Sequence, residues 1–198
     1  MNPLPRSQLY LASTSTYRAE LLRRLKIPFE TIDPYVDETA LTGEPPETLA
    51  LRLAELKAQS NTLNQGIIIG CDQVADCNGR VLGKPGDRIN AHAQLSYCSG
   101  NKVTFYTGLA LWIPHKQLLL SEVVSYEVKL RPLSSEEIDR YLASDRPFDC
   151  AGSFKWEALG ISLFERMEGT DPTSLQGLPL IALCRHLRAE SVAIPPIL

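Results

Sequence analysis

The residues best suited to chemistry in this sequence are charged side chains that follow apolar segments. Asp72 comes directly after the segment 66–71, Gly-Ile-Ile-Ile-Gly-Cys, whose β-branched residues are typical of a strand covered on both faces. A carboxylate at the carboxyl end of such a strand lies where open α/β sheets bind their ligands. There it could accept a proton from water or bind a divalent cation. The alternative for Asp72 is an aspartate that forms a turn.

A second group of polar residues follows the apolar segment 8–12. Residues 13–15 are Ser-Thr-Ser, and Arg18 comes shortly after them. If a helix begins here, hydroxyl groups and free backbone N–H groups are available to an anion, and Arg18 in the first turn adds two parallel N–H donors. An ordinary helix cap with a solvent-exposed arginine explains the same residues.

Two lysines and an acidic pair complete the candidates. Lys57 lies at the edge of the apolar face of a predicted helix, and Lys84 lies in a glycine-rich segment. Each lysine could bind a phosphate group or lie in solvent. Asp37 and Glu38 stand in a long polar loop, which either brings further carboxylates to the same site or forms an acidic surface. Converging carboxylates with basic neighbours are what Mg²⁺ with a polyphosphate requires.

Standard catalytic motifs are missing from the sequence. Residues 79–85, Gly-Arg-Val-Leu-Gly-Lys-Pro, are one residue too short for a P-loop and end on proline where a magnesium-binding hydroxyl is needed. The three histidines lie far apart, and the five cysteines show no C-x-x-C spacing, so a zinc site or a histidine-based triad is not expected. Cys71 beside Asp72 is expected to be an inert buried thiol.

Composition restricts the class of protein further. The chain has 198 residues with 44% hydrophobic and 22% charged residues, enough for one globular domain over 1–198 or for two lobes around a cleft. The 20 basic and 23 acidic residues give a formal net charge of −3, which provides no field to hold a nucleic acid. No segment approaches the roughly 18 apolar residues of a membrane span, and we expect a cytoplasmic protein with neither nucleic-acid nor membrane partners.

Strands and helices are mixed along the chain, so their order predicts an α/β fold with a mixed, twisted sheet flanked by helices. Asn78-Gly79 between apolar segments predicts a tight hairpin, and Ser134 with Glu137 predicts a capping box at a helix start. Strands are expected at 8–12, 28–32, 66–73, 102–114, 118–130 and 161–167. Helices are expected at 16–26, from 46 onward, and at 87–98, 138–144 and 180–188.

Taken in order, the motifs of this chain resemble those of the Maf family of nucleoside triphosphate pyrophosphatases. The resemblance extends from residue 9 to about residue 188. No single motif is specific, but their common order makes coincidence very improbable. The matching segments are 11–22 (L-A-S-T-S-x-x-R-x-x-L-L), 36–39 (V-D-E-T), 56–58 (L-K-A), 68–73 (I-I-G-C-D-Q), 83–85 (G-K-P), 103–108 (V-T-F-Y-T-G), 150–155 (C-A-G-S-F-K), 163–166 (L-F-E-R) and 177–180 (G-L-P-L).

The resemblance implies a fold of the Maf and ITPase type with a deep cleft, and a possible homodimer. It implies hydrolysis of a nucleoside triphosphate between the α and β phosphates, with Mg²⁺ or Mn²⁺ as the divalent cofactor. Asp72 matches the proton acceptor of the family, and Glu38 matches an acidic residue that binds the metal together with it. The positions that match phosphate-contacting residues are Ser13, Arg18, Lys57 and Lys84.

Two segments resemble the subgroup that acts on 7-methyl-GTP. Pyrimidine-directed members have Asp-Thr where this chain has Asp72-Gln73, and residues 150–157 also follow the 7-methyl-GTP pattern. The resemblance assigns base selection to Tyr17, Gln73 and Glu157. The positive ring of 7-methylguanine favours an aromatic face, and its N–H donors favour a carboxylate acceptor. Packing in the core is the alternative for Tyr17.

The sequence also departs from the subgroup pattern. Trp156 stands where a small residue is expected, Ala158 replaces a glycine, and Tyr17 replaces a tryptophan, so the wall of the base pocket differs. Two other functions remain open at this point. One is a pyrimidine-directed enzyme that prefers dTTP or UTP, and the other is a nucleotide-binding regulator of cell division without turnover.

Overall fold

The computed structural model describes residues 8–196, and they form two compact units. The first unit contains the described residues up to Gln73, residues 107–124 and those from Asp171 onward, and the second contains 74–106 and 125–170. Three long strands contribute residues to both units: β3 (Ile67–Cys77), β5 (Lys102–Ile113) and β6 (Leu118–Leu130).

The strands form one mixed sheet in the order β2-β1-β3-β5-β6-β7, with β4 paired to β3. Strand β1 (Leu9–Ala12) pairs in parallel with both β2 (Phe29–Ile32) and β3. The pairs of β4 (Arg80–Leu82) with β3 and of β7 (Phe164–Gly169) with β6 are antiparallel. The predicted α/β fold with a mixed sheet is confirmed.

Five α-helices and four short 3₁₀ helices connect the strands of the described chain. None of the helices within residues 8–196 is long and apolar enough to cross a membrane. The α-helices are α1 (Thr16–Arg23), α2 (Pro46–Gln59), α3 (Arg88–Cys98), α4 (Ser135–Asp145) and α5 (Leu180–Ala189). The 3₁₀ helices are η1 (Pro114–Lys116), η2 (Ala151–Ser153), η3 (Leu159–Leu163) and η4 (Pro172–Gln176).

Most predicted elements occur close to their expected positions. The hairpin is confirmed, because Asn78 and Gly79 have φ of 52° and 81° between the paired residues Cys77 and Arg80, as a type I′ turn requires. Some boundaries were wrong. Helix α1 ends at Arg23 and not at residue 26. Strand β3 continues beyond Gln73 to Cys77, and residues 161–163 belong to η3, so that β7 starts only at Phe164.

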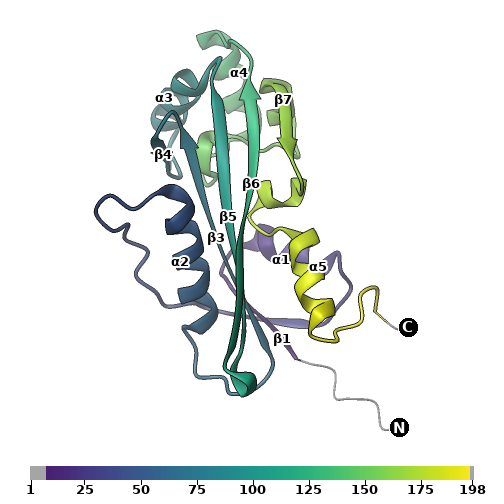
Figure 1. Ribbon diagram of the computed structural model, residues 1–198. Helices are drawn as coiled ribbons and strands as arrows, with labels where there is room; N and C mark the ends of the chain where they lie inside the picture. The colour runs from purple at the N-terminus through teal and green to yellow at the C-terminus, as the bar shows by residue number, and fades with distance from the viewer. Residues whose placement is uncertain (1–7, 197–198) are drawn as a thin grey trace. The chain divides into compact units, whose positions relative to one another are not determined.

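Helices cover both faces of the sheet in the first unit. Figure 1 shows α2 on one side of β3 and β5, and α1 with α5 on the other. The face beneath α1 and α5 contains a buried apolar cluster, to which β3 contributes Ile67, Ile69 and Cys71. Side chains of a strand alternate between its faces, so Gly70 and Asp72 belong to the face beneath α2.

Helix α2 lies against the backbone of two strands through glycines. A Cβ atom added to Gly70 would lie 2.1 Å from the carbonyl oxygen of Ala54, and one added to Gly108 would lie 2.2 Å from that of Ala50. Any side chain larger than hydrogen at either position would displace the helix. This close approach fixes the height of α2 above β3, and with it the position of every side chain that α2 directs at the sheet.

The connections in the first unit create a topological switch point. Strands β1 and β2 are parallel neighbours, yet the helix that follows β1 covers one face of the sheet and the helix that follows β2 covers the other (Figure 1). Ligands of open α/β sheets bind at the carboxyl ends of strands with such diverging connections. Residues just after Ala12 and Ile32 are therefore candidates for a site.

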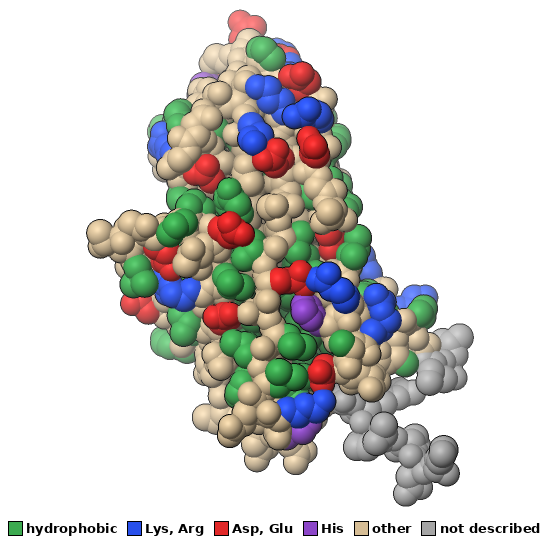
Figure 2. Space-filling view, in the orientation of Figure 1, with side chains coloured by type: hydrophobic (Ala, Val, Ile, Leu, Met, Phe, Trp, Pro, Cys, Tyr) green, Lys and Arg blue, Asp and Glu red, His purple; other side chains and the backbone are tan. Residues whose placement is uncertain are grey.

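Polar contacts hold α5 and η4 in the first unit. Glu122 of β6 accepts hydrogen bonds from Arg185 and His186 of α5. Figure 2 shows acidic and basic side chains beside one another on the face in view. Burial opposes the ionised form of Glu122, but these two partners lower its pKa below the usual value. Asp171 accepts from the backbone N–H of Thr173 at 3.0 Å and of Ile181 at 2.7 Å, which ties η4 to the start of α5.

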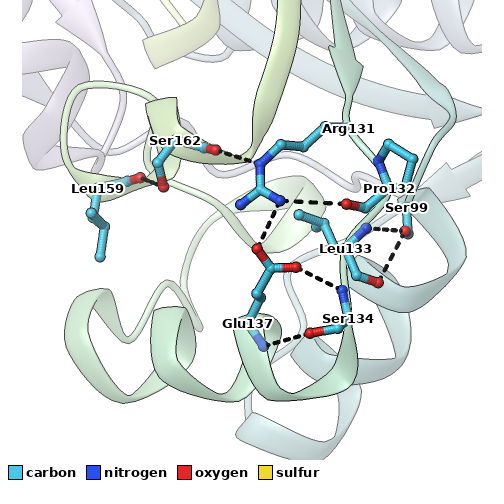
Figure 3. A network of polar contacts seen from close by, with 8 residues as sticks. All are labelled: Ser99, Arg131, Pro132, Leu133, Ser134, Glu137, Leu159 and Ser162. Atoms are coloured by element: carbon cyan, nitrogen blue, oxygen red, sulfur yellow. Dashed lines mark hydrogen bonds and ion pairs between the residues drawn. The ribbon is translucent and has the colours of Figure 1, made fainter.

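The second unit is organised around Arg131 at the end of β6 (Figure 3). Its Nε donates to the Ser162 carbonyl at 3.0 Å and its Nη1 to Glu137 Oε1 at 2.8 Å. The predicted capping box is confirmed, because Glu137 Oε2 accepts from the Ser134 N–H at 2.9 Å and Ser134 Oγ accepts from the Glu137 N–H at 3.2 Å. The hydrogen bond from the Ser134 N–H lowers the pKa of Glu137 most, and the hydrogen bond from Arg131 lowers it further.

Candidate active site

A single lysine joins two of the predicted site carboxylates. Lys57 Nζ lies 2.6 Å from Asp72 Oδ1 and 2.7 Å from Glu38 Oε1. The side chains of Lys57 and Asp72 are only 6% and 11% exposed, whereas that of Glu38 is 60% exposed. The group therefore consists of a buried ion pair, Lys57 with Asp72, and a second, solvent-facing carboxylate, Glu38, on the same ammonium.

The fold explains how these three residues meet. Asp72 lies two residues after Gly70 on the face beneath α2. Lys57 lies in the last turn of α2 beside Ala58, whose backbone N would lie 2.5 Å from a Cβ at Gly70. Glu38 comes from the loop between β2 and α2, which starts at the switch point. The close approach of helix and strand thus allows a lysine to reach a buried carboxylate.

The sequence predicted Asp72 at the end of its strand, and this was wrong: Asp72 lies in the middle of β3. Strand β3 extends beyond it because the Asn78-Gly79 hairpin adds β4. Ser13, by contrast, does follow the end of a strand, because β1 ends at Ala12, which pairs with Gly70. At Asp72, strand β3 has already passed the end of its pairing with β1.

The residues that follow β1 form a second polar group. Ser13 is 5% exposed, and its Oγ accepts from the Ser15 N–H at 3.2 Å and from Arg18 Nη1 at 3.3 Å. Arg18 Nε also donates to the Gly177 carbonyl at 2.9 Å. Ser15 is the N-cap of α1, so the helix-cap interpretation is right for Ser15. Arg18, however, is a partly buried arginine fixed at two of its nitrogens, and not a free surface side chain.

The loop carboxylate beside Glu38 does not join the lysine. Asp37 Oδ1 accepts from the Thr39 N–H at 2.9 Å, and hydrogen bonds from Thr39 lower the pKa of Asp37. Arg52 of α2 holds the same loop through Glu44, at 2.6 Å, and lowers the pKa of Glu44 to about 2. Of these two acidic residues, Glu38 contributes its carboxylate to the site, whereas Asp37 forms a hydrogen bond within its own loop.

Gln73 points to the opposite face of β3 from Asp72. Its Nε2 donates to the Ser174 carbonyl at 2.6 Å and to Thr107 Oγ1 at 3.2 Å. Thr107 and Ser174 were not recognised from the sequence as functional residues. The segment 103–108 was noted only as a motif, and no local pattern indicates that Ser174, in η4, would lie beside β3.

The remaining predicted residues are described within their own units. Tyr17 is half-buried on α1 in the first unit. In the second unit, Lys84 is exposed in the loop before α3, and Glu157 is exposed between η2 and η3. Trp156 beside it is half-buried, and its Nε1 has no hydrogen-bond partner within the described chain. The roles of Tyr17, Lys84 and Glu157 remain predictions.

Asp72 and Glu38, the two carboxylates at Lys57, fit a divalent cation that takes its other ligands from the substrate and water. Asp72 and Glu38 already converge on one positive charge, the Lys57 ammonium. Among residues 8–196 there is no cluster of three or more metal-ligating side chains. Mg²⁺ is commonly bound by one or two carboxylates together with phosphate oxygens of the substrate and water. The two carboxylates suit this arrangement and do not suit a cage made of protein ligands alone.

Cys71, next to Asp72, has the properties of a core residue. It is fully buried in the cluster beneath α1 and α5, and burial raises the pKa of its thiol to about 12. A thiol that stays protonated at neutral pH is a poor nucleophile. Its side chain therefore contributes packing, as the sequence predicted.

Comparison with known proteins gives consistent similarities. A family model described as "Maf-like protein" matches residues 8–190. A 7-methyl-GTP pyrophosphatase of Vibrio vulnificus (strain CMCP6) is 50% identical over 188 residues, which cover 94% of this chain and 97% of the relative. A protein of the same name from Idiomarina loihiensis is 50% identical over 188 residues, covering 93% and 95%. The solved Ham1 protein of Staphylococcus aureus is 14% identical with a TM-score of 0.49, covering 92% of this chain and 99% of that one, a likeness too weak to support any conclusion.

Proposed function

This chain belongs to the Maf family, and from that premise we propose that it is a pyrophosphatase for 7-methyl-GTP or a closely related modified nucleotide. The reaction would break the bond between the α and β phosphates and release the nucleoside monophosphate and pyrophosphate. Two relatives named 7-methyl-GTP pyrophosphatase, each 50% identical over nearly the whole chain, support this substrate. The cytoplasmic location, a homodimer and a single domain over 1–198 remain predictions.

The observation that carries the proposal is the Lys57 ammonium shared by Asp72 and Glu38. The ion pair fixes Asp72 through Oδ1, which leaves Oδ2 as the oxygen that would accept a proton from the attacking water. A general base must be held within hydrogen-bond reach of the proton that it removes. A carboxylate anchored by a buried lysine meets that need better than a freely rotating surface aspartate.

The basic residues of the first unit would bind the triphosphate. Within residues 8–196, Arg18 donates through Nε and through Nη1, so Nη2 is the nitrogen that we expect to donate to a phosphate oxygen. Ser13 and the N-terminus of α1 add a hydroxyl and the positive end of the helix dipole. Together with Lys57, these groups would offset the charge that develops on the phosphates in the transition state. Lys84 is proposed to act in the same way.

Glu38 and Asp72 would hold the divalent cation, Mg²⁺ or Mn²⁺. When bound, the cation would polarise a phosphoryl oxygen and reduce the repulsion met by the attacking water. The protein's own contribution is to keep two carboxylates close together beside the triphosphate. We expect turnover to require Mg²⁺ or Mn²⁺ and to cease when a chelator is added.

A panel of nucleotides with pyrophosphate detection tests the proposed reaction. The purified full chain is given 7-methyl-GTP, GTP, UTP and dTTP in Mg²⁺ or Mn²⁺, and we expect 7-methyl-GTP to be turned over fastest. Faster turnover of UTP or dTTP would identify a pyrimidine-directed enzyme. Binding of nucleotide without release of pyrophosphate would identify a regulator.

A pair of lysine variants tests the geometry. Lys57→Met removes the ammonium shared by Asp72 and Glu38, and we expect kcat to fall at least about a hundredfold because the base and the phosphates lose their positioning. Lys116→Met is the matched control, because Lys116 is an exposed lysine that also pairs with one glutamate, Glu190, at 2.5 Å. The control should retain wild-type turnover, and equal losses in both variants would contradict the role of Lys57.

A further inference from the structure

The side-chain amide of Gln73 is held in one orientation. Both of its contacts use the nitrogen: Nε2 donates to the Ser174 carbonyl at 2.6 Å and to Thr107 Oγ1 at 3.2 Å. A primary amide has two N–H protons, so these two bonds use both of them. The group that Gln73 can still offer to a ligand is the acceptor Oε1.

Chemistry alone excludes the reverse orientation of this amide. The Ser174 carbonyl can only accept a hydrogen bond, so the amide nitrogen and not its oxygen must face it. The hydroxyl of Thr107 donates its single proton to the same carbonyl at 3.0 Å, which leaves Thr107 Oγ1 as an acceptor toward Gln73. Turning the amide around would place Oε1 against one carbonyl and against a hydroxyl whose proton is already used.

The partners of Gln73 are themselves rigid. Thr107 and Ser174 are fully buried. The Ser174 N–H and hydroxyl donate to the Asp171 carbonyl at 3.1 and 2.7 Å, and Asp171 is bonded in turn to the start of α5 through the Ile181 N–H. A buried polar network in which each member is satisfied resists rearrangement. The Gln73 amide is thus held on a preformed support.

We propose that Thr107 is a positioning residue for base selection. Thr107 and the Ser174 carbonyl together hold the Gln73 amide in one orientation. In this orientation, Gln73 Oε1 accepts a hydrogen bond from an N–H donor of the base. This inference rests on the proposed function, because it places Gln73 at the base. A fixed acceptor favours guanine, whose Watson–Crick edge presents adjacent N–H donors. It disfavours uracil and thymine, whose carbonyl oxygens flank a single N–H.

Substitution of Thr107 tests the proposal through selectivity. Thr107→Val keeps the shape but leaves one Nε2 proton without an acceptor, so the preferred orientation of the amide is weakened. We expect kcat/KM for 7-methyl-GTP to fall about three- to tenfold, the value of one ordinary hydrogen bond, while kcat/KM for UTP stays constant or rises. Thr107→Ser retains the hydroxyl and should restore the wild-type ratio.

The pattern of losses separates positioning from simple damage. A variant that is only destabilised loses turnover of 7-methyl-GTP and UTP by the same factor, and that result would overturn the proposal. So would a Thr107→Val protein with the wild-type ratio, or a Thr107→Ser protein as impaired as the valine variant.

Nuclear magnetic resonance of the free protein gives a readout that does not depend on turnover. The Gln73 side-chain NH₂ signals are identified by their loss in Gln73→Glu. In the wild type we expect both protons to be protected from exchange, and in Thr107→Val we expect one of them to lose protection. If the wild type hydrolyses no triphosphate, the proposed function fails and these signals alone decide the orientation. Two rapidly exchanging protons in the wild type, or unchanged signals in Thr107→Val, would refute the fixed amide.

Discussion

Replacing Gly70 by alanine tests the link between the packing of α2 and the site. A Cβ at this position would lie 2.1 Å from the Ala54 carbonyl oxygen, 2.5 Å from the Ala58 N and 2.9 Å from the Ala58 Cβ. Favourable contacts between such atoms lie at about 3.5 Å. The obstacles are backbone atoms of a helix and cannot rotate away. Helix α2 must therefore withdraw by about 1 Å from β3 to reach tolerable contact distances.

Both stability and turnover should respond to this displacement. Overpacking of a dense core costs about 1–3 kcal/mol, and a backbone clash belongs at the upper end of that range. A loss of about 3 kcal/mol lowers Tm by about 6–12 °C for a chain of this size. Lys57 moves with α2, so its 2.6 Å bond to Asp72 would lengthen beyond the range of a hydrogen bond. A misplacement of this size costs about a hundredfold in turnover.

Urea unfolding and pyrophosphate release measure the two effects. Gly83→Ala is the matched control for stability, because a Cβ at Gly83 would meet nothing within 4 Å and Gly83 is not among the glycines with positive φ. Its unfolding free energy should stay within about 0.5 kcal/mol of the wild type. If Gly70→Ala is as stable as Gly83→Ala, the argument that α2 rests on the backbone of β3 is wrong.

Three further outcomes are expected. Asp72→Asn keeps the shape of the side chain but removes the base, and steady-state kinetics should show turnover lowered by about a hundredfold or more with an unchanged circular dichroism spectrum; wild-type rates would exclude Asp72 as the base. Glu157→Ala should lower the ratio of 7-methyl-GTP to GTP turnover more than it lowers turnover itself, and an unchanged ratio would remove Glu157 from base selection. The pKa of Glu137 is lowered in the folded state, so its ionised form stabilises the protein above about pH 4.5 and this stabilisation is lost as the pH falls through the lowered pKa. Urea unfolding across this range should therefore show wild type and Glu137→Gln converging at low pH, and a constant difference would contradict the assignment.

Local patterns were sufficient for most of the elements. The Asn78-Gly79 turn and the capping box of Ser134 and Glu137 both occur as predicted, because each depends on the backbone conformation and hydrogen bonds of a few consecutive residues. Boundaries that depend on distant partners were less accurate. Strand β3 runs past Gln73 because pairing with β4 extends it, and the start of β7 at Phe164 follows its pairing with β6.

The sequence by itself determined the order of strands and helices, the motifs shared with the family and the candidate residues Asp72, Glu38 and Lys57. Only the tertiary structure decided that one ammonium joins both carboxylates, and that Thr107 and Ser174 fix the amide of Gln73. The physical reason lies in the range of the interactions. Periodicity, turns and caps depend on neighbours within a few residues, whereas these contacts join atoms as far as 101 residues apart, and only the close packing of α2, η4 and the sheet brings them within bonding distance.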